Sequence, residues 1–369
     1  MTILTGLETL NPKFISFEQS PLIQKSHPPA SYCFFTGPLF LEKYSEEMVD
    51  FYKSVASPLD VLRDDRRRTA AVNLLLSLTP EELFSREREV HSLLQAIEQQ
   101  GSLYQRFDIQ RNGKTRHLAV PKDAFRDFLE AYVLPLVLSA KVHPACHGGE
   151  KGWSVERSLG THLPLVSAVS FDMSDAYQQA TINYVFDFFY DNLPDSKGNA
   201  KRDLAGLLAS ACTVVSSTPE EKRKGAFEAW LPQGSPLSTA LFNRMMRPVD
   251  EALGRQARKK GMRYSRWIDD FVLSSPKRRR FEHFADVMRI AQENCSIAPQ
   301  KLFFFYNCPA YLLGHRVSLN TIEKVSREEF NEKRGEPYTA LENTHPRGGD
   351  IYMQFDDFLE ETVDDSHRF

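Results

Sequence analysis

Two adjacent aspartates, Asp269 and Asp270, interrupt a run of apolar and β-prone residues, and this feature constrains the fold more than any other. Residues 264–268 precede the pair and residues 271–273 follow it. Such residues favour strands and Asp favours turns, so the pattern predicts a hairpin with two carboxylates at its tip. A solvated loop tip is the plainer interpretation, and the neighbouring sequence has to decide between the two.

A third aspartate stands at the end of another expected strand. Residues 166–171 form a short apolar run suited to a buried strand, and Asp172 follows it, 97 positions before Asp269 (269 minus 172). Two Mg²⁺ ions about 4 Å apart need carboxylates from separate rigid elements; one ion activates the attacking oxygen and the other stabilises the leaving phosphate. Asp172, Asp269 and Asp270 are therefore candidate ligands of a phosphoryl-transfer site.

The rest of the chain mixes helices and strands irregularly, which indicates the α+β class. Asn112-Gly113, a dipeptide typical of tight turns, predicts a hairpin between residues 104–110 and 115–120. A helix is expected to start at Thr79 and stop at Gly101. The other expected elements are helices at 123–134, 174–192, 204–211, 237–253 and 279–293, a hairpin at 263–275, and strands at 301–306 and 311–317.

Composition limits the kinds of partner and the compartment. The 369 residues suffice for two or three packed lobes, and a net charge of −3 gives no overall basic field. A nucleic acid would then be held by local patches such as residues 66–68 and 277–280, although solvated faces explain such runs equally well. Five scattered cysteines, no leader-like start and no run of about 20 apolar residues predict a cytoplasmic protein without a membrane partner.

Six blocks in one order between residues 104 and 317 resemble the motifs of reverse transcriptases. Residues 264–271, YSRWIDDF, resemble the family's Tyr-x-Asp-Asp hairpin, with Trp267 in place of the usual Tyr. Residues 171–177, FDMSDAY, look like its first catalytic motif, and residues 231–238, LPQGSPLS, are similar to its Pro-Gln-Gly segment. The other blocks are Arg116 with Pro121-Lys122, then Pro299-Gln300-Lys301, then Leu312-Leu313-Gly314.

A further stretch, His143 to Gly149 followed by Gly152-Trp153-Ser154 and His162, resembles the family's His-Gly-Phe…Gly-x-Ser…His segment between fingers and palm. A zinc site at His143, Cys146 and His147 is the alternative, but no second ligand pair lies at the usual spacing.

The resemblance implies a right-hand polymerase with fingers, palm and a small or reduced thumb, and an antiparallel palm sheet with helices on one side. Residues 1–100 would form an N-terminal helical extension and the start of the fingers, and 101–165 the fingers. Residues 166–317 would form the palm, with a fingers–palm insertion at 194–236. Residues 318–369 would form a short thumb or an acidic tail, since Asp and Glu recur between residues 350 and 365 without any Lys or Arg.

The resemblance also assigns roles to single residues. Asp172 and Asp269 would be the principal metal ligands, with Asp270 as a third and Met173 beside them. Tyr177 would leave no room for a 2′-hydroxyl, and Lys301 would act as a general acid toward pyrophosphate. The remaining assignments are Arg116 and Lys122 at the triphosphate, Gln233 and Gly234 beneath the nucleotide and template, and Leu313 and Gly314 as the primer grip. Aromatic packing, a plain turn and solvated cations are the simpler explanations for Tyr177, Gly234 and the basic residues.

The expected activity is RNA-directed DNA synthesis from dNTPs and a DNA primer, with two Mg²⁺ ions or Mn²⁺ as their substitute. A noncoding RNA template and a role in anti-phage defence follow from the resemblance to compact defence-associated enzymes, because no ribonuclease H, maturase or endonuclease block is present. Protein-primed or untemplated synthesis, and a catalytically silent RNA-binding scaffold, are alternatives. RNA-directed RNA synthesis is a further alternative, and Tyr177 argues against it. A partner protein or a second copy of the chain is left open.

Overall fold

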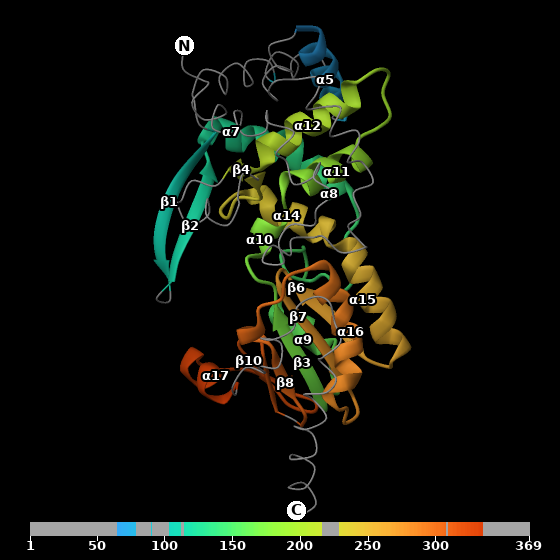
Figure 1. Ribbon diagram of the computed structural model, residues 1–369. Helices are drawn as coiled ribbons and strands as arrows, with labels where there is room; N and C mark the ends of the chain where they lie inside the picture. The colour runs from blue at the N-terminus through green and yellow to red at the C-terminus, as the bar shows by residue number, and fades with distance from the viewer. Residues whose placement is uncertain are drawn as a thin grey trace, which may run out of the picture. The chain divides into compact units, whose positions relative to one another are not determined.

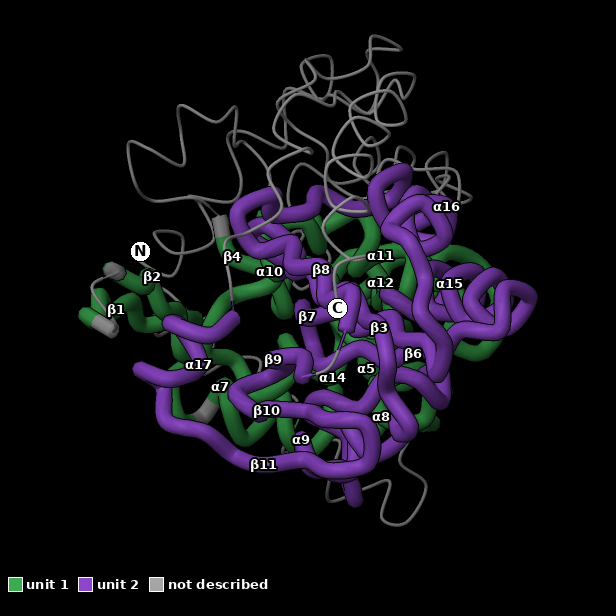
Figure 2. The backbone as a smooth tube through the Cα atoms, turned by 90° about the horizontal axis from the view of Figure 1, so that it is seen from below, with its two compact units in different colours: residues 1–34, 41–141, 177–245 green, residues 35–40, 142–176, 246–369 purple. Residues whose placement is uncertain are grey.

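The computed structural model describes residues 65–78, 90, 103–111, 114–215, 229–307 and 309–334. The chain divides into two compact units (Figure 2): unit 1 holds residues 1–34, 41–141 and 177–245, and unit 2 holds residues 35–40, 142–176 and 246–369. Apart from Val90, the helix expected from Thr79 lies outside the described residues, as do the Asn112-Gly113 turn and the acidic stretch after residue 350. Within the described ranges, no helix has both the length and the apolar character that a bilayer crossing requires.

Unit 2 is built on a four-stranded antiparallel sheet (Figure 1) in the order β6-β7-β3-β8. The strands are β3 (Ser167–Asp172), β6 (Arg263–Trp267), β7 (Asp270–Ser275) and β8 (Phe303–Phe305). The central strands β3 and β7 pair from Ser167 opposite Ser275 to Asp172 opposite Asp270. All six residues of β3 are buried, as the apolar run predicted. The expected hairpin at 263–275 is confirmed as β6 and β7.

The two faces of this sheet pack against different layers, because side chains alternate along each strand. On one face Phe304 packs edge-to-face against Phe281 and Phe284 of α16 (Phe281–Asn294), and α15 (Arg247–Lys259) lies beside α16. The opposite face enters a core shared with α9 (Val155–Gly160), a small sheet of β9 (Ala310–Leu312), β10 (His315–Val317) and β11 (Ile322–Lys324), and α17 (Arg327–Lys333). The two long helices therefore cover one side, as expected for a palm.

Unit 1 combines a long hairpin with a group of helices. The hairpin consists of β1 (Tyr104–Arg111) and β2 (Lys114–Pro121), in the predicted place. The helices are α5 (Asp65–Ser77), α7 (Asp123–Phe128), η3 (Leu129–Val133), α8 (Leu134–Ser139), α10 (Ala176–Gln179), α11 (Ile182–Asn192), α12 (Ala200–Cys212) and α14 (Pro236–Met245). Between α12 and α14, the short strands β4 (Val214–Val215) and β5 (Ala229–Trp230) pair with each other. Arg67 Nε donates to Asp203 at 2.9 Å and ties α5 to α12.

Two helices expected to be continuous are broken. The prediction for 174–192 is wrong, because the chain leaves the helix at Ala180 and Thr181 to contact β5: Leu231 N donates to Ala180 O at 3.1 Å, and Thr181 bridges Trp230. The helix expected at 237–253 is α14 and α15, separated at Met246. Pro248 explains this break, since proline lacks an N–H and its ring excludes the preceding turn of a continuous helix.

Three other boundaries also differ from the predictions. The helix expected to end near Pro135 continues through the π-turn η3 into α8, with Pro135 in the first turn of α8, where proline is tolerated. The strand expected at 311–317 is two strands, β9 and β10, joined at Leu313 and Gly314 with φ of 50° and 78°. The strand expected at 301–306 begins only at Phe303, since residues 299–301 form the 3₁₀ turn η4 (Pro299–Lys301).

Candidate active site

The three predicted aspartates lie at one end of the unit 2 sheet. Asp172 ends β3 and pairs across the sheet with Asp270, the first residue of β7. Asp269 belongs to the two-residue turn that joins β6 to β7, since Trp267 pairs with Asp270. The backbone N–H of Met173 donates to the carbonyl of Asp269 at 3.1 Å and so ties this turn to the end of β3. Separate strands therefore fix the two directly paired carboxylates.

Burial and the charges of neighbouring carboxylates disfavour ionisation of Asp172 and Asp270. Asp172 is 6% exposed, and burial first, with the charge of Asp269 second, raises its pKa to about 6. Burial, then Asp269 and Asp172, raise the pKa of Asp270 as well. Buried like charges are unfavourable unless cations offset them. The end of the sheet therefore favours the binding of positive charge.

Two basic side chains reach this end of the sheet. Lys301, at the end of η4, donates from Nζ to Asp172 Oδ2 at 2.6 Å. The guanidinium of Arg334, which follows α17, lies 3.9 Å from the ring centroid of Phe303 and donates from Nη2 to Ser170 Oγ at 3.0 Å. Burial lowers the pKa of Arg334, and the charges of Asp270 and Asp172 oppose that shift.

The donor chemistry fits a hard divalent cation. Carboxylate oxygens are the ligands that Mg²⁺ prefers, and Asp172 Oδ1 is buried without a hydrogen-bond partner among the described residues. No set of three or more His, Cys, Asp and Glu side chains is already gathered around one point in the described ranges. The other Asp172 oxygen, Oδ2, accepts the hydrogen bond from Lys301 Nζ.

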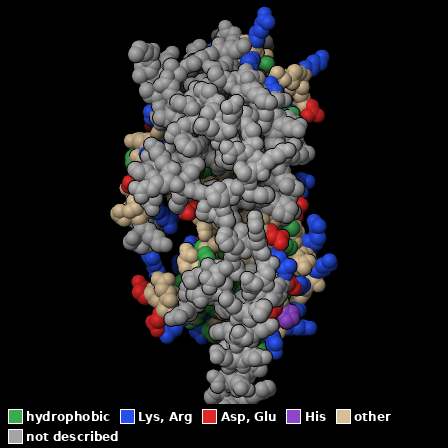
Figure 3. All heavy atoms as spheres, viewed as in Figure 1, with side chains coloured by type: hydrophobic (Ala, Val, Ile, Leu, Met, Phe, Trp, Pro, Cys, Tyr) green, Lys and Arg blue, Asp and Glu red, His purple; other side chains and the backbone are tan. Residues whose placement is uncertain are grey.

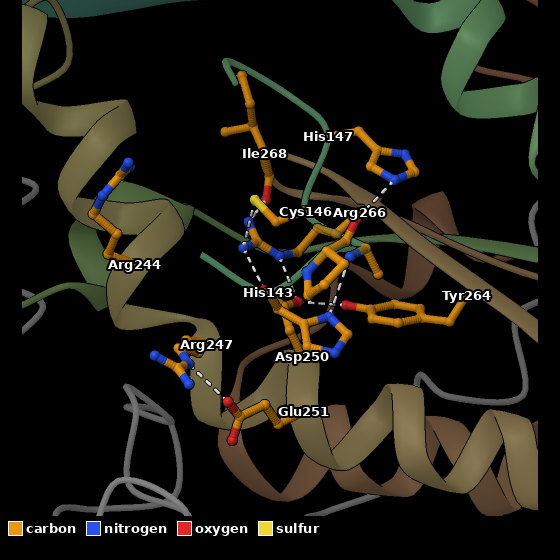
Figure 4. Close-up of polar contacts among 12 residues, drawn as sticks. His143, Cys146, His147, Arg244, Arg247, Asp250, Glu251, Tyr264, Arg266 and Ile268 are labelled. Carbon is orange, nitrogen blue, oxygen red and sulfur yellow. Dashed lines mark hydrogen bonds and ion pairs between the residues drawn. The ribbon is translucent and has the colours of Figure 1, made fainter. Parts of the chain in front are cut away.

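The turn that carries Asp269 is strained and is held from beneath by a buried arginine (Figure 4). Ile268 has a φ of 60°, a conformation that β-branched residues rarely adopt. Arg266 Nη1 donates to the carbonyl of Ile268 at 2.5 Å. The same fully buried guanidinium donates from Nε and Nη2 to the carboxylate of Asp250 at 2.8 and 2.7 Å. Asp250 also accepts from the hydroxyl of Tyr264 at 2.6 Å, so α15 anchors the turn.

A second support comes from residues 145–148, which run beside β6. Arg266 N donates to Ala145 O, and His147 N donates to Arg266 O, both at 2.8 Å. Gly148 then packs directly on the turn: a Cβ there would lie 2.5 Å from Ile268 N and 2.7 Å from the carbonyl carbon of Trp267. Only glycine fits at this position without displacing the carboxylate-bearing turn.

His147, in the stretch that runs beside β6, is held by contacts within the protein. The ring nitrogens of His147 lie 2.8 Å from Ser158 Oγ and 3.1 Å from Pro144 O, and its ring stacks on Trp153 with 3.5 Å between the ring centroids. The Cys146 thiol accepts from Arg266 Nη2 at 3.2 Å. These contacts give the residues of the zinc alternative a supporting place beneath the hairpin.

The predicted nucleotide-contacting residues lie in unit 1. The Tyr177 hydroxyl is 2.8 Å from Thr239 Oγ1, and its ring packs edge-to-face on Phe242. Gln233 O accepts from Ala119 N at 2.8 Å, and Gly234 has a φ of 113° with Val120 Cγ2 3.2 Å from where a Cβ would be. The Pro-Gln-Gly turn therefore packs on β2. Arg116 is exposed on β2, and Lys122 occupies the position immediately before α7.

Four residues at the site have no role in the sequence-based predictions: Gly148, Asp250, Arg266 and Arg334. Arg266 carries a usable signal, because a charged residue at an inward position of a buried strand needs a buried partner. Nothing in the sequence around Arg334 distinguishes it from other charged residues.

A palm-like antiparallel sheet with paired aspartates at one end, in an α+β chain, defines a nucleic-acid polymerase of the right-hand class. The chain belongs to the reverse transcriptase (RNA-dependent DNA polymerase) family, whose profile matches residues 106–326. Reverse transcriptase domains generally use divalent metal ions.

Curated relatives are similar over part of their length. The Retron Mx162 reverse transcriptase of Myxococcus xanthus is 25% identical over 180 residues, 46% of this chain and 36% of that protein. The Retron Ec86 reverse transcriptase of Escherichia coli is 23% identical over 180 residues, 48% of this chain and 50% of that protein. The chain thus spans half or less of the length of these relatives.

Telomerase structures are similar at a lower level. Telomerase from Candida albicans in complex with a TWJ fragment of telomeric RNA is 15% identical, with a TM-score of 0.40, covering 60% of this chain and 45% of that one. Apo telomerase from Candida tropicalis is 12% identical, with a TM-score of 0.42, covering 60% and 47%.

Proposed function

We propose that this protein is an RNA-directed DNA polymerase that extends a DNA primer with dNTPs on an RNA template. The observation that carries the proposal is the pairing of Asp172 with Asp270 across two central strands, beside Asp269, in a chain of the reverse transcriptase family. Phosphoryl transfer asks a protein mainly for positioning and charge neutralisation. Strands β3 and β7 supply the positioning.

Asp172, Asp269 and Asp270, with Met173 adjoining, would hold two Mg²⁺ ions, and Mn²⁺ is the proposed substitute. When bound, such ions activate the attacking hydroxyl and neutralise the leaving phosphate. The chain contributes rigid carboxylates and a basic group beside them. Lys301 would leave Asp172 when the carboxylate accepts a cation, and its ammonium would then be free to serve phosphate oxygens as a proton donor.

Tyr177 is the proposed selector of deoxynucleotides. Its hydroxyl contact with Thr239 and its edge-to-face contact with Phe242 keep the ring in one orientation, which a steric filter requires. Arg116 and Lys122 are proposed for the triphosphate, Gln233 and Gly234 for the nucleotide and template, and Leu313 and Gly314 for the primer. A noncoding RNA template and a role in anti-phage defence are proposed from the resemblance to compact defence-associated enzymes.

The test is dNTP incorporation on a primed RNA template with Mg²⁺, comparing the wild type with an Asp269→Ala, Asp270→Ala double variant. The double variant should be inactive. The matched control removes two exposed acids of unit 1, Asp127→Ala with Glu130→Ala, and should retain activity. Equal incorporation by the Asp269, Asp270 variant would rule the proposal out.

Two further arms separate the alternatives. Synthesis that continues without template supports untemplated addition, and DNA that stays attached to denatured protein supports protein priming. If synthesis continues without template, the proposal of RNA-directed synthesis fails, while the proposed role of the three aspartates in catalysis stands.

A further inference from the structure

Unit 2 carries a second concentration of basic residues, at the opposite end of the sheet from the aspartates. The last turns of α15 contribute Arg255, Arg258 and Lys259, and the loop after β7 contributes Lys277, Arg278 and Arg280, all exposed. We call these six residues the distal basic surface. Arg279 Nη2 donates to the carbonyl of Lys260 at 2.8 Å, which holds the loop against the end of α15.

Arg279, which is not one of the six residues, holds the loop in place, so the six cations remain available to a ligand. Arg279 makes the structural contacts, to Lys260 and to Ser275 Oγ at 3.3 Å. The nearby acids are Glu282, in the first turn of α16, and Asp286, which is already paired with Lys260 and with Arg289. A single acid, Glu282, therefore stands against the six cations. The local charge therefore stays positive although the chain has a net charge of −3. In Figure 3, Lys and Arg side chains recur along the side on which Figure 1 draws α15 and α16.

This surface is separate from the proposed active site. Asp270 begins β7 and Ser275 ends it, so Lys277 lies seven residues further along (277 minus 270) in the direction of an extended strand. At about 3.3 Å per residue, that is roughly 20 Å from the carboxylates. A ligand of this surface would therefore not be the reacting nucleotide.

The chemistry of the surface selects its ligand. Its cations match phosphate oxygens, and residues 255–261 and 276–280 contain no aromatic side chain. Surfaces that hold single strands combine cations with aromatic platforms on which bases stack, whereas a duplex presents mainly its phosphates. The next aromatic after the loop, Phe281, is 2% exposed and belongs to the core. A surface of cations alone fits a duplex backbone.

We propose that the distal basic surface binds the phosphate backbone of a double-stranded segment of RNA, outside the site of synthesis. The inference rests on the proposed function only in taking RNA as the partner. Binding of structured RNA and polymerisation should therefore be separable by mutation.

The test measures fluorescence anisotropy of a labelled RNA hairpin with the full chain over a range of salt concentrations. The variant is Lys277→Gln, Arg278→Gln, Arg280→Gln, which spares Arg279 and its contact with Lys260. The control, Lys141→Gln, Lys151→Gln, Lys197→Gln, removes the same charge from exposed positions scattered over the chain.

The slope of log K against log salt should become shallower by roughly 2–3 in the loop variant, about 0.9 for each phosphate that the variant no longer neutralises, and stay unchanged in the control. Equal weakening in both triple variants, or none in either, overturns the proposal, because net charge or another surface would then be responsible. Equal weakening of binding to a labelled single strand overturns the duplex assignment. The Asp269→Ala, Asp270→Ala protein should bind the hairpin like the wild type. The binding test therefore does not depend on whether the protein is a polymerase.

Discussion

Gly148 packs so closely under the Ile268–Asp269 turn that no methyl group fits, and its substitution should act on catalysis. We expect Gly148→Ala to displace the turn and lower kcat about 100-fold, the effect of misplacing a catalytic group by about 1 Å. Gly160→Ala is the control, since nothing lies within 4 Å of the added Cβ. Primer extension measures both, and full activity in Gly148→Ala would show that the turn tolerates displacement.

Arg266 should act as a positioning residue whose structural and catalytic effects can be separated. Arg266→Met leaves Asp250 buried and unpaired, which should lower the free energy of unfolding by about 3–5 kcal/mol in urea titrations. Adding Asp250→Leu removes the unpaired charge and should restore most of that stability. Activity should remain low, because the Ile268 carbonyl still lacks its donor. Recovery of activity together with stability would mean that Arg266 only stabilises the fold.

The sequence is informative about single residues where chemistry follows from local pattern. An Asp-Asp pair between β-prone runs, and an Asp after a buried run, place Asp172 and Asp270 at strand ends and Asp269 in the adjoining turn. The role of Arg266 depends on Asp250, and the role of Gly148 depends on the backbone of Trp267, 119 positions away (267 minus 148). A local sequence pattern cannot predict contacts between residues that lie far apart in the chain.

At the scale of elements, strands and hairpins are predicted better than helix boundaries. Alternation and turn residues are local, and they locate β1, β2, β3, β6 and β7. The break between α10 and α11 exists because β5 contacts residues 180–181, a tertiary interaction that overrides helix propensity. The break at Met246 has a local cause, Pro248. The apolar periodicity of residues 237–253 nevertheless continues across Pro248 and so predicts one continuous helix.

The β9–β10 turn gives a prediction at this scale. Leu313 and Gly314 both have positive φ, the geometry of a tight two-residue hairpin turn. A Cβ on Gly314 would meet nothing within 4 Å, so Gly314→Ala tests backbone conformation alone. We expect the free energy of unfolding, measured in urea, to fall by about 1 kcal/mol. Gly160→Ala, in a helix, is the matched comparison, and an equal effect in both would contradict the assignment to positive φ.

At the scale of the whole molecule, buried neutral histidines should set the acid limit of stability. His162 is fully buried between Ser274 Oγ at 2.6 Å and Ser265 Oγ at 2.7 Å, and so joins β7 to β6. Burial lowers the pKa of His162 from 6.5 to about 3. Below pH 6.5 the His162 side chain therefore binds a proton in the unfolded chain but stays neutral in the folded chain. The free energy of unfolding falls as pH falls from about 6.5 toward 3.

Substitution of His162 isolates this contribution. His162→Gln retains a hydrogen-bonding side chain but does not titrate, so its free energy of unfolding should depend less steeply on pH, by up to about 1.4 kcal/mol per pH unit below pH 6.5. His147, whose pKa burial lowers to about 4, is present in both proteins and cancels in the comparison. His283→Gln, at an exposed position of α16, is the matched substitution for comparison. Parallel curves for the wild type and His162→Gln below a pH of about 6.5 would show that His162 is not the titrating group.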